Sequence, residues 1–302
     1  MKILFASTTE PAARWLPELG RALPSDLITL EAAEDVDVAL VANPARDTFR
    51  TLPNLKFVQS LWMGVDHLLA DASLPRGVPV ARLLDPGMIA AMRETVLAHV
   101  LDWHRMHFRY RDLQAAGRWQ QLPQVMASER TIAMLGLGTL GSVAAQALAT
   151  LGFQVLGWSR RPRALPGVQC ITELPLVLER SDLVICMLPL TKATRGILNA
   201  RTFELMPEGA CLINVARGEH VVENDLREAL DSGWITHAYL DVFEKEPLHE
   251  SHPFWKHPRV TLTPHVAALT EPRTAIPEIV ANIERLRRAE PLEGLVDVEA
   301  GY

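Results

Sequence analysis

The sequence predicts an α/β protein with two Rossmann-like, doubly wound parallel sheets. Short apolar runs alternate with helical segments along a chain of 302 residues, which is typical of parallel strands covered by helices on both faces. A long helical stretch, residues 89–116, separates these runs into two sets. The length and the 48% apolar content suffice for two hydrophobic cores. We therefore expect two domains, residues 1–99 together with 275–302, and residues 100–274.

The expected strands are short apolar runs bounded by turn residues. In the first set they cover residues 2–6, 37–42, 56–60 and 79–83. In the second set they cover residues 131–135, 154–158, 183–187, 211–215, 237–241 and 260–263. A last segment, residues 275–289, has the amphipathic pattern of a helix.

Charge and cysteine content exclude several classes of protein. The net charge is −6, from 30 basic and 36 acidic residues, which argues against a nucleic-acid or anionic-membrane partner. No apolar run reaches the length of a membrane span. The cysteines, Cys170, Cys186 and Cys211, form no C-x-x-C pair, so neither a disulfide framework nor a metal site is indicated. We expect buried thiols in a reducing cytoplasm.

A glycine-rich loop follows the first strand of the second set. It has the sequence Gly136-Leu137-Gly138-Thr139-Leu140-Gly141, and a segment rich in Ala and Leu comes next. In this setting the first glycine permits a tight turn, the second lets the backbone approach a pyrophosphate, and the third lets helix and strand pack closely. The helix N-terminus offers free N–H groups to phosphates. We interpret the loop as a dinucleotide site; a plain turn is the alternative, and methyltransferases share such loops.

The end of the next strand indicates which dinucleotide binds. Sites for NAD usually have Asp or Glu there, about 20 residues beyond the glycine loop, to hold the ribose 2′-hydroxyl. In this chain Ser159, Arg160, Arg161 and Arg163 occupy that stretch. Guanidinium groups pair with a 2′-phosphate that a carboxylate would repel. We therefore predict NADPH as the cofactor, with NADH weaker; a solvated basic loop is the alternative.

Three ionisable residues, Arg217, Glu246 and His265, each follow an apolar run near the end of the chain. Ligands of open α/β sheets bind outside the carboxyl ends of the strands. A guanidinium suits a substrate carboxylate and can polarise a keto oxygen. An imidazole beside a carboxylate can transfer a proton near neutral pH. Each residue alone could be a surface side chain, but with a dinucleotide site the trio predicts hydride transfer on a 2-keto or 2-hydroxy acid.

An ordered set of motifs resembles the D-isomer-specific 2-hydroxyacid dehydrogenase family over nearly the whole chain. The set comprises the glycine loop, Leu188-Pro189-Leu190-Thr191 with Thr194 and Gly196, Asn214-Val215-Ala216-Arg217-Gly218, Leu240-Asp241-Val242-Phe243 with Glu246-Pro247-Leu248, and Thr263-Pro264-His265-Val266-Ala267. The closer likeness is to the bacterial glyoxylate and hydroxypyruvate reductases of this family. That likeness rests on Trp158-Ser159-Arg160, residues 166–169, 257–260 and 264–268, and the terminal Gly301-Tyr302.

The resemblance implies a role for each matching residue. His265 would be the acid/base, Glu246 its partner and Arg217 the substrate anchor. Backbone N–H groups in the loop Met63-Gly64-Val65 would bind the substrate carboxylate. Further expected cofactor contacts are Leu188, Pro189, Thr194, Val215, Ala216, His265 and Asp241, the last holding the nicotinamide carboxamide. Leu61, Trp62 and Met63 are bulkier than the family's usual residues, and ordinary core packing is the alternative to a place in the pocket.

The implied reaction is NADPH-dependent reduction of small 2-keto acids, glyoxylate to glycolate and hydroxypyruvate to glycerate. The resemblance also implies an active site in the cleft between the domains and a C-terminal helix that returns to the N-terminal domain. We expect a cytoplasmic homodimer. Two alternatives stay open: an enzyme of this family for another 2-keto acid, such as phenylpyruvate or a longer aliphatic acid, and a non-catalytic NAD(P)-sensing protein. Formate is disfavoured because formate-type relatives carry Gln in place of Glu246.

Overall fold

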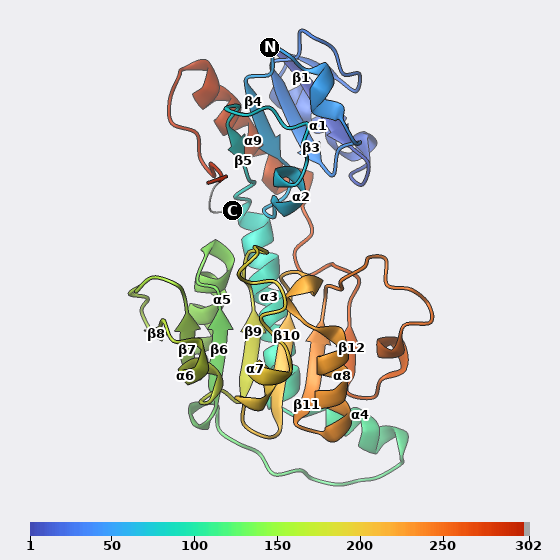
Figure 1. The fold of residues 1–302 in the computed structure, drawn as a ribbon, viewed down its shortest axis with the longest axis vertical. Coiled ribbons are helices and arrows are strands. Elements are labelled where there is room, and N and C mark those ends of the chain that lie inside the picture. Colours follow the sequence, from blue (N-terminus) through green and yellow to red (C-terminus); the bar gives the residue numbers. More distant parts are fainter. Residues whose placement is uncertain (299–302) are drawn as a thin grey trace. The chain divides into compact units, whose positions relative to one another are not determined.

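The computed structural model describes residues 1–298, and the chain divides into two compact units (Figure 1). Unit 1 consists of residues 1–89 with the C-terminal segment from Leu269, and unit 2 consists of residues 90–268. The division falls earlier than the expected points, 99/100 and 274/275, because the long helix packs into the second core from its second turn onward. Gly301 and Tyr302 lie outside the described residues.

Unit 1 contains a five-stranded parallel sheet in the order β2-β1-β3-β4-β5. The strands are β1 (Lys2–Ser7), β2 (Leu27–Thr29), β3 (Val38–Ala42), β4 (Phe57–Ser60) and β5 (Val80–Ala81). The helices are α1 (Ala12–Ala22), α2 (Asp66–Leu69) and α9 (Pro272–Arg287), with a 3-10 turn η1 (Thr48–Thr51). The edge strand β2 was not expected, because three half-exposed residues leave little apolar pattern.

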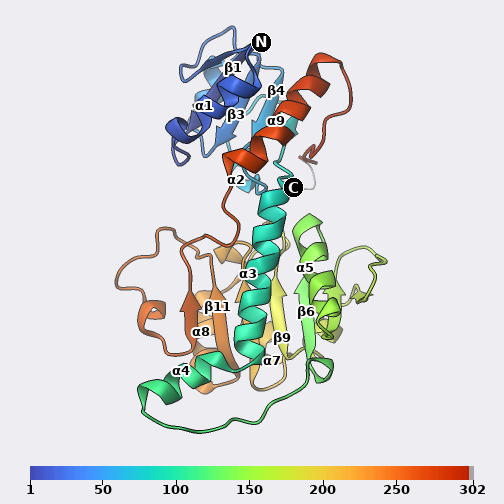
Figure 2. The same cartoon turned by 180° about the vertical axis from the view of Figure 1, so that it is seen from behind.

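Alternate residues of a strand point to opposite faces of a sheet, and both faces of this sheet are covered. Phe5 of β1 packs against the fully buried Trp15 of α1, with ring centroids 6.1 Å apart. The helices α1 and α9 lie side by side on that face (Figure 2). Leu4 of β1 belongs to a separate cluster with Phe49 of η1 and Leu68 of α2. The sheet is therefore wound on both sides.

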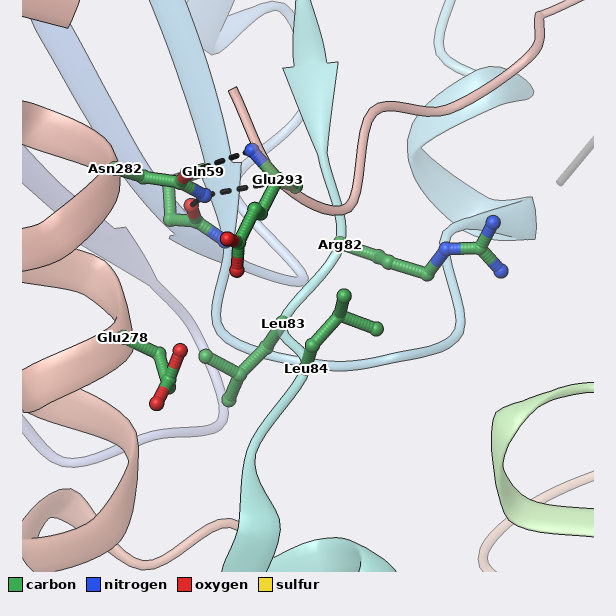
Figure 3. Close-up of a pocket in the computed structure, with 7 residues that line it drawn as sticks. All are labelled: Gln59, Arg82, Leu83, Leu84, Glu278, Asn282 and Glu293. Carbon is green, nitrogen blue, oxygen red and sulfur yellow. Dashed lines mark hydrogen bonds between the residues drawn. The ribbon is translucent and has the colours of Figure 1, made fainter. Parts of the chain in front are cut away.

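The chain beyond α9 returns to the edge of this sheet. The amide nitrogen of Asn282 donates to Gln59 Oε1 at 2.8 Å and to the carbonyl of Glu293 at 3.0 Å. Figure 3 shows these three residues pointing toward one another beside a small cavity of about 10 Å³. Ala81 of β5 forms an antiparallel bridge with Leu295. The C-terminal segment thus extends the sheet of unit 1 past its last strand.

Unit 2 contains a seven-stranded parallel sheet in the order β12-β11-β10-β9-β6-β7-β8. The strands are β6 (Thr131–Leu135), β7 (Gln154–Trp158), β8 (Val168–Ile171), β9 (Leu183–Cys186), β10 (Ala210–Asn214), β11 (Ile235–Leu240) and β12 (Val260–Leu262). The helices are α3 (Pro86–His104), which starts in unit 1, then α4 (His107–Ala115), α5 (Thr139–Thr150), α6 (Leu174–Leu178), α7 (Ala200–Glu204) and α8 (Glu223–Ser232). The 3-10 turns are η2 (Ala127–Glu129), η3 (Gly218–His220) and η4 (Pro253–Lys256).

Two apolar layers enclose this second sheet. The helices α3 and α5 cover one face, with Val96 and Leu148 fully buried in the same cluster (Figure 2). The helices α6, α7 and α8 cover the other face, where Phe203 and Leu226 are buried (Figure 1). The expected fold class, two doubly wound parallel sheets, is confirmed.

Three sequence expectations need correction. The helical stretch 89–116 is two helices, because Met106 adopts a left-handed conformation with φ 57° between α3 and α4. The strand β8 was not expected, because it is a half-exposed edge strand. Cys186 and Cys211 are buried, whereas Cys170 is only half-buried. Within residues 1–298, no helix is long and apolar enough to span a bilayer.

Candidate active site

Neighbouring strands bring the predicted trio to one edge of the second sheet. The strands β10, β11 and β12 are adjacent and parallel, so their carboxyl ends point the same way. Arg217 follows β10, Glu246 lies on the loop after β11, and His265 follows β12. The glycine loop follows β6 at this same edge of the sheet, two strands away from β10. The chain order reverses around β6, which has β7 on one side and β9 on the other, and ligands of such sheets bind at this switch point.

The imidazole of His265 is hydrogen-bonded to the carboxylate of Glu246. Nδ1 lies 2.7 Å from Oε2, and the other oxygen, Oε1, accepts the N–H of Phe243 at 3.0 Å. Burial raises the pKa of Glu246, but the hydrogen bonds from His265 and Phe243 and the charges of His265 and Arg217 outweigh it and hold the pKa below its usual value. The carboxylate therefore stays ionised as the partner of the imidazole.

The loop that carries His265 is held by Asp241, which lies directly after β11. One carboxylate oxygen of Asp241 accepts the hydroxyl of Thr263 at 2.6 Å and the N–H of Val266 at 2.9 Å, and the other accepts the N–H of Ala267 at 2.9 Å. The N–H of His265 donates to the Asp241 carbonyl at 2.8 Å. These bonds hold His265 at φ 54°, a left-handed conformation that non-glycine residues rarely adopt. The sequence did not indicate this structural role of Asp241.

A short turn at the end of β10 positions Arg217. The buried Asn214 donates from its amide nitrogen to the Arg217 carbonyl at 2.9 Å, and Nη1 of Arg217 donates to the Ala216 carbonyl at 2.7 Å. A Cβ atom at Gly218 would lie 1.9 Å from the carbonyl carbon of Phe243. Only glycine therefore allows this turn to approach the loop that carries Glu246.

His220 is a residue of the site that the sequence did not reveal. It is fully buried, and its Nδ1 lies 3.3 Å from the backbone nitrogen of Arg217. Its Nε2 lies 3.3 Å from the carbonyl of Pro189. Burial lowers the pKa of His220, against the hydrogen bonds to Pro189 and Arg217 that raise it. A neutral imidazole thus links the turn of Arg217 to the loop after β9.

The glycine loop has the expected strand–loop–helix setting. Gly136 follows β6 with φ 101°, and a Cβ there would lie 2.6 Å from the Met187 carbonyl oxygen. A Cβ at Gly141 would lie 2.0 Å from the Gly136 oxygen, so the loop and α5 are in direct contact. By contrast, a Cβ at Gly138 would meet no atom within 4 Å among residues 1–298. No side chain of the described residues caps the N-terminus of α5, where Thr139 and Leu140 begin the helix.

The basic stretch after β7 lies next to the glycine loop, because β7 pairs with β6. The hydroxyl of Ser159 donates to the Arg161 carbonyl at 2.7 Å. The guanidinium of Arg163 donates to the carbonyl of Leu137 inside the glycine loop. Arg160 and Arg161 are exposed. Arg163 is therefore anchored to the glycine loop.

The remaining cofactor candidates lie on the loops after β9 and β10. Thr194 is nearly buried, accepts the N–H of Thr191 at 2.8 Å and donates to the Pro189 carbonyl at 2.7 Å. Its hydroxyl therefore shapes the loop that contains Leu188 and Pro189. Leu188, Val215 and Ala216 are 8%, 5% and 7% exposed, so mainly their backbone is available to a ligand.

The predicted substrate loop lies in unit 1, between β4 and α2. Met63 and Gly64 are half-buried, and Val65 is buried against the core. The backbone N–H groups of Gly64 and Val65 donate to no acceptor within the described part of the chain. They are thus available to an anion, which is the role that the resemblance implies.

The chain is similar to known proteins in sequence. A model of the D-isomer specific 2-hydroxyacid dehydrogenase family, NAD binding domain, matches residues 97–267. The chain is 41% identical to the glyoxylate/hydroxypyruvate reductase A of Serratia proteamaculans (strain 568), over the whole of both chains.

Two solved structures resemble the chain over its whole length. A D-isomer specific 2-hydroxyacid dehydrogenase from Xanthobacter autotrophicus Py2, in complex with NADPH and MES, is 42% identical, with a TM-score of 0.96 over 100% of this chain and 99% of that one. An NADPH-dependent glyoxylate/hydroxypyruvate reductase from Sinorhizobium meliloti, in complex with NADP and sulfate, is 36% identical, with a TM-score of 0.95 over the same shares. The expected resemblance is confirmed, and this chain belongs to the D-isomer specific 2-hydroxyacid dehydrogenase family of oxidoreductases.

Proposed function

We propose that this enzyme uses NADPH to reduce small 2-keto acids, glyoxylate to glycolate and hydroxypyruvate to glycerate. The observation that carries the proposal is the hydrogen-bonded pair of His265 and Glu246 in a structure where the turn of Arg217 reaches the same loop. This is the set of groups needed to protonate a keto oxygen and to bind a carboxylate. The names of the relatives in Serratia and Sinorhizobium support glyoxylate and hydroxypyruvate as the substrates.

The cofactor site in this proposal is the edge formed by β6, β7, β9 and β10. The uncapped N-terminus of α5 and the open space at Gly138 suit a pyrophosphate. Ser159, Arg160 and Arg161 are assigned to the 2′-phosphate, because opposite charges pair there without a competing carboxylate. The nicotinamide half is assigned to backbone groups of Leu188, Pro189, Val215 and Ala216, together with Thr194. The carboxylate of Asp241 accepts hydrogen bonds from Thr263, Val266 and Ala267. A carboxylate has about four acceptor positions, so one is left for the carboxamide. NADPH, when bound, supplies the hydride.

The proton in this reaction comes from His265. Glu246 accepts the Nδ1–H of the imidazolium, which leaves Nε2 as the donor to the keto oxygen. The ionised carboxylate also stabilises the charged imidazolium before transfer. After transfer, the neutral imidazole keeps its Nδ1–H on Glu246 and regains its proton at Nε2 from water.

The substrate is bound through its charge. Arg217 offers a planar guanidinium that can bind the carboxylate by two hydrogen bonds and neutralise charge that grows on the keto oxygen. In unit 1, the free backbone N–H groups of Gly64 and Val65, with Met63 as a neighbour, are assigned to a substrate carboxylate. In this assignment unit 1 is the substrate domain and unit 2 the dinucleotide domain.

We further propose a cytoplasmic homodimer. The support is the segment between α4 and β6, where Trp119 is completely exposed and Met126 is 69% exposed. Burying an aromatic side chain of this size against a second copy would be favourable by about 2 kcal/mol. Sedimentation equilibrium of the wild type and of Trp119→Ala tests the dimer.

NADPH-consumption kinetics on a panel of 2-keto acids test the function. We expect glyoxylate and hydroxypyruvate to have higher kcat/KM values than phenylpyruvate or longer aliphatic acids. A preference for a bulky acid would assign the enzyme another substrate within the family. Dinucleotide binding with negligible turnover of every acid would instead identify a sensing protein.

A further inference from the structure

A single carboxylate in unit 1 connects two tryptophans. Glu10 lies on the loop that follows β1, and its Oε2 accepts the indole N–H of Trp15 at 3.2 Å. Its Oε1 accepts the indole N–H of Trp62 at 3.3 Å. Trp15 is fully buried in α1, whereas Trp62 is half-buried on the loop after β4. Glu10 therefore connects a fixed core residue to the loop that carries Gly64 and Val65.

The position of Glu10 is itself constrained. Its backbone N–H donates to the hydroxyl of Ser7, at the end of β1, at 2.7 Å. The carboxylate forms no ion pair within residues 1–298, so its two indole donors are the polar partners that hold it. Hydrogen bonds to an ionised carboxylate are roughly twice as strong as those between neutral groups. The Glu10 side chain therefore links the indoles of Trp15 and Trp62 and does not pair with a cation among the described residues.

Trp62 is held through its backbone and through its indole ring. Its backbone N–H donates to Ser60 Oγ at 3.0 Å, and its carbonyl accepts the N–H of Leu83 at 3.0 Å. Its ring lies 5.3 Å from the ring of His67, centroid to centroid. With the bond to Glu10, both the backbone and the indole have one orientation. A large side chain is therefore held in place on the loop that also carries Gly64.

The place in the sheet points to a ligand site. In this sheet β2 lies on one side of β1, and β3, β4 and β5 follow on the other side. The strand order therefore reverses at β1, and the switch point lies between β1 and β3. Ligands bind outside the carboxyl ends of the strands at such a point. Glu10 follows the carboxyl end of β1 and Trp62 that of β4, and their side chains are bonded although β3 lies between these two strands in the sheet.

We propose that Glu10 is a positioning residue for substrate selection: it fixes the Trp62 indole as a rigid wall of the 2-keto acid pocket, and this wall restricts the substrate to short chains. The inference rests on the proposed function, because it assigns the wall to the site where Gly64 and Val65 bind the carboxylate. Without Glu10, the indole loses its only hydrogen-bond acceptor among the described residues and can rotate. A longer keto acid then enters, while a short one is held less firmly.

The test is a double-mutant cycle on substrate selectivity. The ratio of kcat/KM for phenylpyruvate to that for glyoxylate should rise about tenfold in Glu10→Ala, which is the scale of steric discrimination in an apolar pocket. The KM for glyoxylate should rise while kcat stays within about twofold, because the reacting groups are unchanged. Trp62→Phe should raise the ratio similarly, and adding Glu10→Ala to it should change nothing further. The matched control is Thr8→Ala on the same loop, because the Thr8 hydroxyl bonds to Asn43 and not to Ser7, Glu10 or Trp62, and it should keep the wild-type ratio.

A second measurement is independent of turnover. The difference in acrylamide quenching between the wild type and Trp62→Phe reports the Trp62 indole, and this difference should increase in the Glu10→Ala background. An active wild type with an unchanged selectivity ratio in both Glu10→Ala and Trp62→Phe would overturn the proposal. If Glu10→Ala fails to fold, Trp62→Phe alone decides whether the wall exists. A wild type that reduces no 2-keto acid refutes the proposed function instead, and the quenching result still decides whether Glu10 fixes Trp62.

Discussion

The Nδ1 atom of His265 lies 2.7 Å from Oε2 of Glu246, and the second oxygen of that carboxylate is held by a backbone N–H. The carboxylate cannot turn away without losing the second bond, so the imidazole has a fixed orientation. His265 has this geometry although its side chain is half exposed. The pair can therefore be tested by changing either partner.

Replacing His265 by Asn should lower kcat by about 10²- to 10⁴-fold, the usual contribution of a general acid. Binding of NADPH, followed by fluorescence titration, should stay near the wild-type value, because the imidazole serves proton transfer more than affinity. A variant that keeps near-normal turnover would remove His265 from this role.

Replacing Glu246 by Gln should lower kcat at least about tenfold, but less than the loss in His265→Asn. The amide keeps an acceptor for one of the two bonds, yet it has no charge to stabilise the imidazolium. Steady-state kinetics with glyoxylate measure the effect. Equal losses in both single variants and in the double variant would mean that the two side chains act as one unit.

Replacing Arg217 by Lys should raise KM for glyoxylate and lower kcat/KM. Lysine keeps the positive charge but loses the planar pair of donors, and it cannot form the bond from Nη1 to the Ala216 carbonyl in the same geometry. Unchanged kinetic constants would show that the substrate carboxylate is anchored elsewhere.

Cofactor choice should depend on Arg160. We expect at least about a tenfold preference in kcat/KM for NADPH over NADH, since one charge-assisted hydrogen bond contributes about 1.5–3 kcal/mol. Arg160→Ala should weaken NADPH and leave NADH nearly unchanged. Arg180→Ala, which removes an exposed arginine bonded to Gln169, is the matched control. Equal use of both cofactors by the wild type would support the solvated-loop interpretation.

Stability should fall at acidic pH partly because of His237. This imidazole is 3% exposed, its Nε2 lies 2.9 Å from the Thr261 hydroxyl, and burial lowers its pKa to about 4 from a usual value of 6.5. The unfolded chain therefore binds more protons than the folded chain between these values, and the free energy of unfolding decreases as pH falls through this range.

The variant His237→Phe isolates this effect. From about pH 7.5 to about pH 5, the wild type should lose about 2 kcal/mol more of its unfolding free energy than the variant does. Urea titrations of both proteins at the two pH values measure the difference. Parallel pH dependences would mean that folding does not lower the pKa of His237.

The fold class and the positions of Arg217, Glu246 and His265 after strands could be predicted from the sequence alone. The pattern of apolar residues in a segment reports its secondary structure and its burial, and both are local properties of the sequence. The glycine loop, the basic stretch at Ser159 and the positions of Arg217, Glu246 and His265 after strands could be read for the same reason. Strand ends of a parallel sheet share one edge, so position along the chain was enough to predict the gathering of these residues.

Other features depend on contacts between segments that lie far apart in the sequence. The hydrophobic periodicity of each segment does not report such contacts. The left-handed Met106 interrupts a locally helical pattern, and the edge strands β2 and β8 form by pairing with β1 and β7 although their residues are half-exposed. The hydrogen bonds of Asp241 to the His265 loop require the pairing of β11 with β12. The bond from Glu10 to Trp62 joins residues whose strands, β1 and β4, are not even neighbours in the sheet. Strand order and register decide such contacts, so they could not be predicted from local sequence patterns.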